Sequence, residues 1–361
     1  MRKVRVELGK DSYDIIIGFG LNAEMEAFIR NGGFSGKAVI VSDSNVGKLY
    51  GEEVREALAR AGLDAELCII PAGEPSKTLV EAERLYTRAI EKGLDRKSPI
   101  FALGGGVVGD LAGFVAATYM RGVPFIQLPT SLLAQVDSSV GGKVAVNHAL
   151  GKNLIGAFYQ PKAVFMDLNF MKSLPQREIF TGLGEVVKYG IIDDEDFFDF
   201  LEGHRDSVLS LEAETLLHII ARSCEIKALV VSQDEKESGL RRILNFGHTM
   251  AHAIEEETCY SRYNHGEAVA IGMMGAAYIS ERIGHISGDV TERVRKLLLS
   301  MKLPVQAEGC TVEHMYQSIF RDKKTLNGRV NWVLMKRIGE TCVDDNVPED
   351  VVREAMRNCI R

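Results

Sequence analysis

Three histidines and one glutamate in the second half of the chain have the residue types and spacing to hold a metal ion. His248 and His252 are four residues apart, which places them on one face of a helix. His265 follows at the start of the next apolar helical pattern, and Glu185 lies in an otherwise apolar helical segment. Two or three imidazoles with one carboxylate are typical of a catalytic zinc that keeps one position open. Spacing alone favours His248 with His252 as the ligand pair; for any one of these residues, a surface or capping role is the alternative.

A glycine-rich turn in the first half predicts a dinucleotide-binding site. Residues 104–109 read Gly-Gly-Gly-Val-Val-Gly, follow the apolar run 100–103 and open a helical pattern. Glycines there let backbone N–H groups approach a pyrophosphate, whose charge the start of the helix favours. The acid expected about 20 residues later is missing between residues 111 and 136. Asp43 could replace it if its strand neighbours the glycine turn, and a purely structural tight turn is the alternative.

A set of cations and amides predicts a site for an anionic ligand. Lys143, Lys152 and Asn153 lie in glycine-punctuated sequence with few other charges, unlike a solvated helix face. Glu74 and Lys77 follow another strand, where a solvated turn with a helix cap is the alternative. Converging cations would select a phosphate or a carboxylate. Further cations that could take part are Arg121, Lys188, Lys227, Arg241 and the Lys323-Lys324 pair, several of them as ordinary surface charges.

Alternating strands and helices must position the first set of residues, and long helices the second. Up to about residue 168 short apolar runs alternate with stretches of helical period, and after residue 169 helical patterns dominate. We therefore expect an α/β N-terminal domain (1–168) with a mostly parallel, Rossmann-like sheet, a mainly α-helical C-terminal domain (169–361), and an active site in the cleft between them. The expected strands are 4–8, 13–17, 38–41, 67–70, 100–103, 125–128 and 330–335, and the expected helices include 46–61, 79–92, 211–231, 247–258, 266–283 and one that opens at Pro348.

Composition excludes several classes of protein. The 361 residues carry a net charge of −7, which argues against a general nucleic-acid or anionic-membrane surface. The N-terminus has no apolar core typical of a secretory signal, and the longest apolar stretch is shorter than the roughly 18 residues of a membrane span. The six cysteines are scattered without a Cys-x-x-Cys pair, so we expect them to be reduced. A cytoplasmic location is the expectation.

Five ordered motifs together resemble the 3-dehydroquinate synthase family. They are Ala-Leu-Gly-Gly-Gly-Val-Val-Gly-Asp (102–110), Val-Asp-Ser-Ser-Val-Gly-Gly-Lys (136–143), Gly-Lys-Asn-Leu-Ile-Gly (151–156), Gly-Glu-Val-Val-Lys-Tyr-Gly (184–190) and Leu-Asn-Phe-Gly-His (244–248). The resemblance runs from about Asp43 to Lys324. It implies a carbocycle-forming phosphorus–oxygen lyase that converts 3-deoxy-D-arabino-heptulosonate 7-phosphate to 3-dehydroquinate and phosphate, in the shikimate pathway of aromatic amino acid biosynthesis. It also implies NAD that is transiently reduced, then β-elimination, return of the hydride and an intramolecular aldol closure.

The resemblance assigns roles only to residues that match its motifs. It implies one zinc or cobalt ion on Glu185, His248 and His265, with His252 turned to the substrate phosphate. It implies a homodimer in which Arg121 reaches the partner's active site, and a phosphorylated sugar acid as the small-molecule substrate. The NAD-binding residues that it implies are Asp43, Glu74, Lys77, Gly105, Gly106, Val107, Gly109, Asp110, Thr130, Ser131, Lys143, Lys152, Phe170 and Ser173. Substrate contacts that it implies are Asp137, Lys143, Asn153, Lys188, Lys227, Arg241, Asn245, His252 and Lys323 or Lys324, with Lys324 preferred.

Three other functions compete with this one. Another sugar-phosphate cyclase would use the same metal and NAD, but a substrate without a carboxylate would not need Arg241 and Lys227 together. A metal-dependent polyol dehydrogenase would release NADH and leave Lys152, Asn153 and His252 without a phosphate to bind. A non-catalytic NAD- or phosphate-binding regulatory protein would not need an intact metal set.

Overall fold

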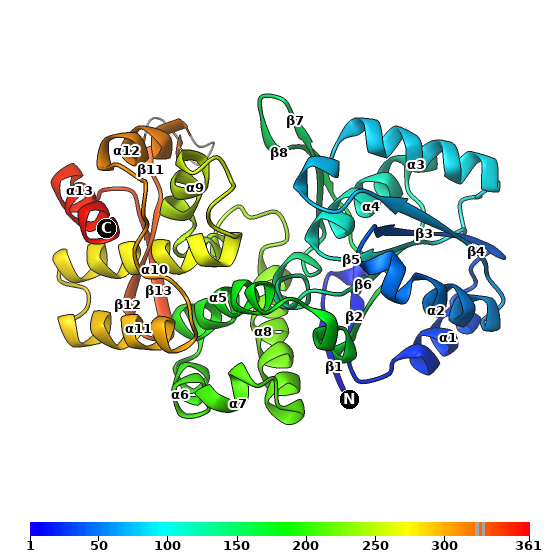
Figure 1. The fold of residues 1–361 in the computed structure, drawn as a ribbon, viewed down its shortest axis with the longest axis horizontal. Helices are drawn as coiled ribbons and strands as arrows, with labels where there is room; N and C mark the ends of the chain where they lie inside the picture. The colour runs from blue at the N-terminus through cyan, green and yellow to red at the C-terminus, as the bar shows by residue number, and fades with distance from the viewer. Residues whose placement is uncertain (322–324, 327–328) are drawn as a thin grey trace. The chain divides into compact units, whose positions relative to one another are not determined.

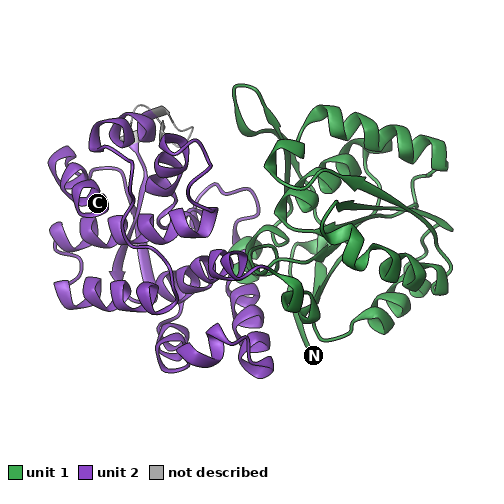
Figure 2. Ribbon diagram, viewed as in Figure 1, with its two compact units in different colours: residues 1–174, 227–232 green, residues 175–226, 233–361 purple. Residues whose placement is uncertain are grey.

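The computed structural model describes residues 1–321, 325–326 and 329–361, so the expected substrate contact at Lys323 or Lys324 lies outside the described residues. The chain divides into two compact units (Figure 2). The first unit is residues 1–174 with 227–232, and the second is residues 175–226 with 233–361. This division falls a few residues after the expected boundary at 168/169. The inclusion of residues 227–232 in the first unit was not expected from the sequence.

A seven-stranded sheet forms the centre of the first unit. Its order is β1-β2-β9-β6-β5-β3-β4, in which only the β1–β2 pair is antiparallel. Helices α1 and α2 lie over one face, and α3 and α4 over the other (Figure 1). Because both faces are covered, strands such as β5 are buried at every position. The bounds are β1 (Arg2–Val6), β2 (Tyr13–Gly18), α1 (Asn22–Asn31), β3 (Lys37–Asp43), α2 (Val46–Arg60), β4 (Asp64–Ile70), α3 (Leu79–Lys92), β5 (Ile100–Gly104), α4 (Gly106–Thr118), β6 (Phe125–Pro129) and β9 (Ala163–Asp167).

The order of these strands reverses direction between β3 and β5, which creates a switch point at the carboxyl edge of the sheet. From β3 the chain first builds β4 on one side and then β5 on the other. Ligands of open α/β sheets bind at such a point. Ser42 pairs with Leu103, so Asp43 and the glycine turn are neighbours, which is the condition under which Asp43 could replace the missing acid. The Rossmann-like class expected from the sequence is confirmed.

The segment between β6 and β9 has more structure than the sequence indicated. It contains a single turn of π-helix, η4 (Ala134–Ser138), and an antiparallel hairpin of β7 (Lys143–His148) and β8 (Gly151–Phe158). Its glycines and mixed polarity obscured the alternation from which strands are predicted. Short helical turns complete the first unit: η1 (Gly9–Asp11), η2 (Glu74–Ser76), η3 (Tyr119–Arg121) and η5 (Leu168–Ser173).

The second unit is mainly helical and is built around α10 (His265–Arg282), most of whose residues are buried. The small antiparallel pair β12 (Trp332–Arg337) and β13 (Glu340–Asp344) packs beside it. Pro348 is the N-cap of the last helix, one position before the expected first turn. The other elements are α5 (Gln176–Asp193), α6 (Glu195–Gly203), α7 (Arg205–Leu209), α8 (Ala213–Gln233), η6 (Leu240–Asn245), α9 (His248–Glu257), α11 (Gly288–Ser300), α12 (Val312–Arg321), β10 (Thr325–Leu326), β11 (Arg329–Val330) and α13 (Glu349–Asn358). No helix among the described residues is long and apolar enough to cross a membrane.

Glycines allow α10 to approach α5 and α9 very closely. A Cβ atom built on Gly266 would lie 1.8 Å from the carbonyl oxygen of Thr181, and one on Gly272 would lie 2.0 Å from that of Gly247. A Cβ on Gly184 would in turn lie 2.6 Å from the carbonyl oxygen of Gly266. These obstacles are backbone atoms, so a side chain here could be accommodated only if the helices moved apart.

We expect Gly266→Ala to lower the free energy of unfolding of the second unit by about 3 kcal/mol, because one methyl group would separate α5 from α10. Denaturant unfolding followed by far-UV circular dichroism measures the change. Gly203→Ala, at a position in α6 where a Cβ has open space, is the control and should be neutral or slightly stabilising. Equal midpoints for the two variants would contradict the close packing of α5 against α10.

Candidate functional site

Three residues from three helices of the second unit meet at one point. Glu185 lies in the middle of α5, His248 is the first residue of α9, and His265 is the first residue of α10. One carboxylate oxygen of Glu185, Oε1, lies 3.6 Å from Nε2 of His248 and 3.7 Å from Nε2 of His265. One ligand atom from each residue lies within 4.8 Å of the other two. Each of the three follows or precedes a glycine at a close helix contact.

These distances fit a divalent metal ion. Ligand bonds of about 2.0–2.2 Å in a tetrahedral site separate neighbouring ligand atoms by about 3.3–3.6 Å. Glu185 is fully buried, and its Oε1 accepts no hydrogen bond from the described residues. A buried carboxylate oxygen without a donor is costly unless a cation lies beside it. The set therefore suits one metal ion and leaves a coordination position for a water or substrate oxygen.

Both imidazoles are oriented by a hydrogen bond at the ring nitrogen that faces away from Glu185. Nδ1 of His265 lies 3.1 Å from Oε1 of Glu255, and Nδ1 of His248 lies 3.2 Å from the carbonyl oxygen of Phe246. Donation at Nδ1 leaves Nε2 deprotonated and able to bind a metal. Glu255 was not expected from the sequence, because it begins an acidic run, Glu-Glu-Glu, that looks like a solvated helix end.

His252 lies outside this group. Its ring centroid is 5.8 Å from that of His248 and 6.5 Å from that of His265, whereas the rings of His248 and His265 are 5.2 Å apart. Spacing of four residues on a helix therefore did not identify the pair that the fold brings to Glu185. The packing of α10 against α9 and α5 selects His265 instead.

Two buried cations and an amide of the second unit lie on α5, which carries Glu185, and on η6. Lys188 is one turn after Glu185 on α5, is almost fully buried, and forms an ion pair with Oε2 of that residue. Arg241 on η6 is 2% exposed and donates to the carbonyl oxygen of Glu235. Asn245, at the end of η6, donates from Nδ2 to Oε1 of Glu237 at 2.5 Å. Each of these side chains is held by a contact within the second unit.

Asp234 organises the loop that leads to Arg241. Its carboxylate accepts hydrogen bonds from the backbone N–H groups of Ser238, Gly239 and Arg241 at 2.9, 2.7 and 3.0 Å. Partial burial raises the pKa of Asp234, but these bonds outweigh it and hold the pKa well below the usual range. The loop therefore remains organised by a carboxylate anion throughout the neutral range.

In the first unit, a lysine and two acids form a network beside the glycine turn. Nζ of Lys77 is 2.6 Å from Oδ2 of Asp110 and 3.7 Å from Oε1 of Glu74, and Lys77 is 4% exposed. Burial raises the pKa of Asp110, while the ammonium of Lys77 opposes this change. The alternative of a solvated turn for Glu74 and Lys77 is thus wrong for Lys77. Asp43, across the switch point, accepts from the N–H groups at the start of α2.

The glycine turn itself opens toward hydroxyl side chains. Gly105 is the N-cap of α4, and a Cβ built on it would lie 3.5 Å from the hydroxyl of Ser131. Thr130 is buried, and its N–H donates to the carbonyl oxygen of Gly104. The expected nucleotide residues Gly106, Val107 and Gly109 lie in the first turn of α4. The N–H of Gly109 donates to the carbonyl oxygen of Gly105, whereas N–H groups at the first positions of a helix have no partner within the helix and can bind an anion.

The remaining expected residues of the first unit lie in three places. Nζ of Lys227, in residues 227–232, donates to both the carbonyl oxygen and Oδ1 of Asp137 at 2.6 Å. Lys143, Lys152 and Asn153 lie on the β7–β8 hairpin, which is exposed at these positions. Phe170 and Ser173 lie on η5, where both contact Tyr50 of α2: the two rings are 4.7 Å apart and the two hydroxyls 2.6 Å. Tyr50 was missed in the sequence, where it is one aromatic residue of an ordinary amphipathic helix.

Arg121 lies at the opposite end of β6 from Thr130. It ends η3 in the left-handed region, with φ of 67°, before β6 begins at Phe125. A strand of this length spans about 15 to 20 Å with its flanking residues. Arg121 is thus remote from the glycine turn of its own sheet.

Comparison with known proteins matches both units. Family models for the N-terminal and C-terminal parts of 3-dehydroquinate synthase match residues 67–181 and 182–325. A 3-dehydroquinate synthase of Caldanaerobacter subterraneus subsp. tengcongensis is 50% identical over 353 residues, covering 98% of this chain and 99% of the relative. One of Desulforamulus reducens is 48% identical over 350 residues, covering 97% and 98%. The chain belongs to the 3-dehydroquinate synthase family.

Solved structures agree with membership of the 3-dehydroquinate synthase family and broaden the comparison. A 2-deoxy-scyllo-inosose synthase complexed with carbaglucose-6-phosphate, NAD+ and Co2+ has a TM-score of 0.90 at 27% identity, covering 99% of this chain and all of that one. The 2-epi-5-epi-valiolone synthase of Streptomyces hygroscopicus subsp. jinggangensis, with NAD+ and Zn2+ bound, has a TM-score of 0.89 at 27% identity, covering 98% of both chains. Membership of the family makes this chain an enzyme of the carbocycle-forming lyase class.

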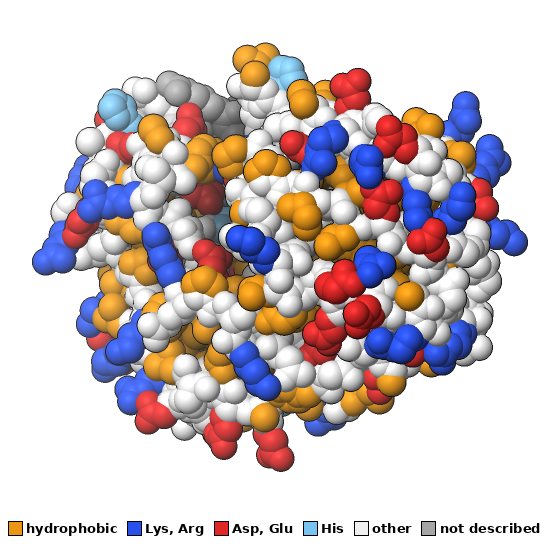
Figure 3. Space-filling view, turned by 45° about the vertical axis from the view of Figure 1, so that its right-hand side comes forward, with side chains coloured by type: hydrophobic (Ala, Val, Ile, Leu, Met, Phe, Trp, Pro, Cys, Tyr) orange, Lys and Arg blue, Asp and Glu red, His pale blue; other side chains and the backbone are white. Residues whose placement is uncertain are grey.

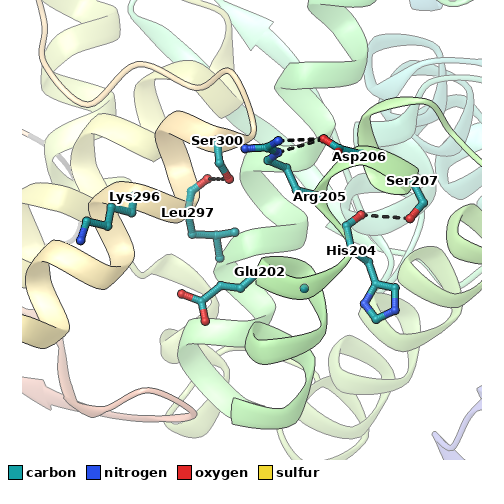
Figure 4. A pocket seen from close by; sticks show the side chains of 9 residues that line it. Glu202, His204, Arg205, Asp206, Ser207, Lys296, Leu297 and Ser300 are labelled. Atoms are coloured by element: carbon teal, nitrogen blue, oxygen red, sulfur yellow. Dashed lines mark hydrogen bonds and ion pairs between the residues drawn. The ribbon is translucent and has the colours of Figure 1, made fainter.

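A surface pocket in the second unit lies apart from the expected site residues. It has a volume of about 400 Å³ and lies between the α6–α7 region and α11 (Figure 4). The interactions drawn there join near neighbours in the sequence, such as Arg205 with Asp206 and Ser300 with the carbonyl group of Leu297. None of the expected site residues lines it. Over the face shown in Figure 3, Lys and Arg side chains are interspersed with Asp and Glu, as the modest net charge implies.

We expect Glu255→Ala to weaken zinc binding by about 10- to 100-fold, because His265 would lose the acceptor that orients its ring. Competition with a chromogenic chelator measures the affinity. Glu256→Ala is the matched control, since the next carboxylate along α9 bonds Ser318 and contacts neither imidazole in the described interactions. An equal loss in both variants would assign the effect to α9 as a whole.

Proposed function

We propose that this chain converts 3-deoxy-D-arabino-heptulosonate 7-phosphate to 3-dehydroquinate and phosphate, using NAD and one zinc ion. The observation that carries this proposal is the set of Glu185, His248 and His265 in a member of the 3-dehydroquinate synthase family. NAD and a divalent metal are supported by the two solved cyclases, which hold NAD+ with Co2+ or Zn2+. When bound, the metal ion supplies a Lewis acid for a substrate hydroxyl and NAD supplies a reversible hydride acceptor.

In this proposal each unit binds a different cofactor. The first unit binds NAD through Asp43, the glycine turn and the Lys77 network, because these groups surround the switch point of the sheet. The second unit binds the metal ion through α5, α9 and α10. The functional domains that we propose are residues 1–168, which bind NAD, and residues 169–361, which bind the metal ion and the substrate.

Cations of this chain hold the two anionic groups of the substrate. Buried Arg241 and Lys227 suit the carboxylate, since both are fixed by hydrogen bonds to neighbouring backbone oxygens. Lys152, Asn153 and His252 suit the phosphate. Anchoring at both ends keeps successive intermediates in one place while phosphate leaves and the ring closes. Lys188 forms an ion pair with Glu185, so its side chain lies beside the proposed metal set.

The competing functions are less well supported. Relatives named 3-dehydroquinate synthase are 45–50% identical to this chain, whereas the solved cyclases acting on other sugars are 27% identical. A glycerol dehydrogenase of Schizosaccharomyces pombe is 16% identical with a TM-score of 0.68, so it shares the fold alone. A cytoplasmic location accords with this biosynthetic role and forms part of the proposal.

We expect the purified protein to release many phosphates from the seven-carbon keto-acid phosphate for each NAD supplied. The hydride is returned within one turnover, so no lasting NADH absorbance should accumulate. Phosphate release and NADH absorbance are followed in the same cuvette with sub-stoichiometric NAD. Glucose 6-phosphate, which lacks a carboxylate, is the control and should yield no phosphate. Stoichiometric NADH would instead indicate a dehydrogenase.

We also expect a homodimer in which Arg121 completes the partner's phosphate site, because Arg121 lies at the far end of β6 from its own glycine turn. Inactive Arg121→Ala and inactive Lys152→Ala subunits are mixed and allowed to exchange, and activity is measured. A hybrid dimer has one site with both residues intact, so part of the activity should return. Exchanged dimers that stay inactive would remove Arg121 from the site.

A further inference from the structure

One asparagine of the first unit joins two segments to which no shared role has been given. Asn147 lies on β7, and its Nδ2 donates to Oε1 of Glu74 at 2.8 Å. Its Oδ1 accepts from the backbone N–H of Asn153 at 3.0 Å. Its own N–H donates to the carbonyl oxygen of Lys77 at 2.7 Å. The side chain thus connects the turn of Glu74 and Lys77 with the turn of Lys152 and Asn153.

The backbone around Asn147 is shaped for this connection. The register of the hairpin is regular up to Val146 with Ile155, then shifts so that His148 pairs with Gly151. Asn147 is left out of the ladder and pairs instead, as a parallel bridge, with Thr78. Opposite it, Asn153 has φ of 55°, a left-handed conformation that an ordinary strand residue does not adopt. The irregularity places one polar side chain between the two turns.

We propose that Asn147 is a positioning residue that couples occupancy of the nucleotide site to occupancy of the phosphate site. The inference rests on the proposed function, in which Glu74 and Lys77 bind NAD and Asn153 binds the substrate phosphate. The side chain of Glu74 is 37% exposed, so a bound nucleotide can fix its carboxylate. A fixed Glu74 fixes the amide of Asn147, which in turn holds the N–H of Asn153.

The coupling is positive and reciprocal. Each ligand orders one of the two turns. The second ligand then binds a hairpin that is already ordered, so less conformational entropy is lost on binding. By thermodynamic linkage, phosphate strengthens NAD binding by the same factor by which NAD strengthens phosphate binding. Coupling of this kind typically changes affinity by about 5- to 150-fold.

The test measures NAD affinity of the intact, metal-loaded protein by calorimetry, with and without saturating inorganic phosphate, which allows no turnover. The parent protein should bind NAD at least about fivefold more tightly with phosphate present. In Asn147→Ala this factor should fall to about one, because both side-chain bonds are lost while the backbone bridge to Thr78 remains. In Asn147→Asp the factor should also be lost, since a carboxylate would face Glu74, but phosphate affinity in the absence of NAD should be retained.

Two controls make the result specific. His148→Ala removes a neighbouring side chain that bonds Leu150 within the hairpin tip, and it should keep the parent's factor. Asn153→Asp places a carboxylate where phosphate is proposed to bind but keeps the backbone N–H that donates to Asn147, so it should abolish the effect of phosphate and show that phosphate acts at the hairpin. No NAD binding by the parent overturns the proposed function and this inference together. NAD and phosphate that bind independently overturn the coupling alone, and an undiminished factor in folded Asn147→Ala overturns the role of Asn147.

Discussion

The second unit depends on one constraint: a fully buried carboxylate must have positive charge beside it. Glu185 lies inside α5, where desolvation would raise the cost of its ionised form. Lys188 neutralises one side of the carboxylate, and the other side faces the Nε2 atoms of His248 and His265. Two neutral imidazoles cannot supply a charge, whereas a divalent cation between the three can. The arrangement is therefore complementary to a metal ion and less suited to a core without one.

This constraint explains where the glycines of the second unit are placed. Gly184, Gly247 and Gly266 are each adjacent in sequence to one residue of the candidate metal set and lie where two backbones touch. Ligand atoms on different helices can come within a metal's reach only if the helix axes are close, and any side chain at these contacts would hold them apart. The same residues that pack the helices thus set the distances of the site.

In the first unit the order of the strands brings Asp43 beside the glycine turn. The fold alone does not separate a carbocycle-forming enzyme from a polyol dehydrogenase, since both kinds of protein share this architecture. Asn147 connects the turn of Glu74 with the β7–β8 hairpin, which carries Lys152 and Asn153.

The sequence alone determined the features that depend on local pattern. Strands β3 to β6 follow from short apolar runs, and helices α2 and α3 and the long helices of the second unit follow from a period of 3.6 residues. Both are properties of short segments. The glycine turn and its helix could be predicted for the same reason. The long motifs that match one family also identified the class of enzyme, because together they contain many of the residues of that family's site.

Only the tertiary structure decided how distant segments are brought together. Helix spacing paired His248 with His252, and the family resemblance pointed to His265 instead. The packing of α10 gives the physical reason, because contacts between helices depend on residues far apart in the chain. Lys77 looked like part of a solvated turn until α4 placed Asp110 against it. Glu255, Tyr50 and Asn147 have no local signature, since each acts through a partner that the sequence places elsewhere. Burial and hydrogen bonding are properties of the assembled fold, and it is these that turn ordinary residues into parts of a site.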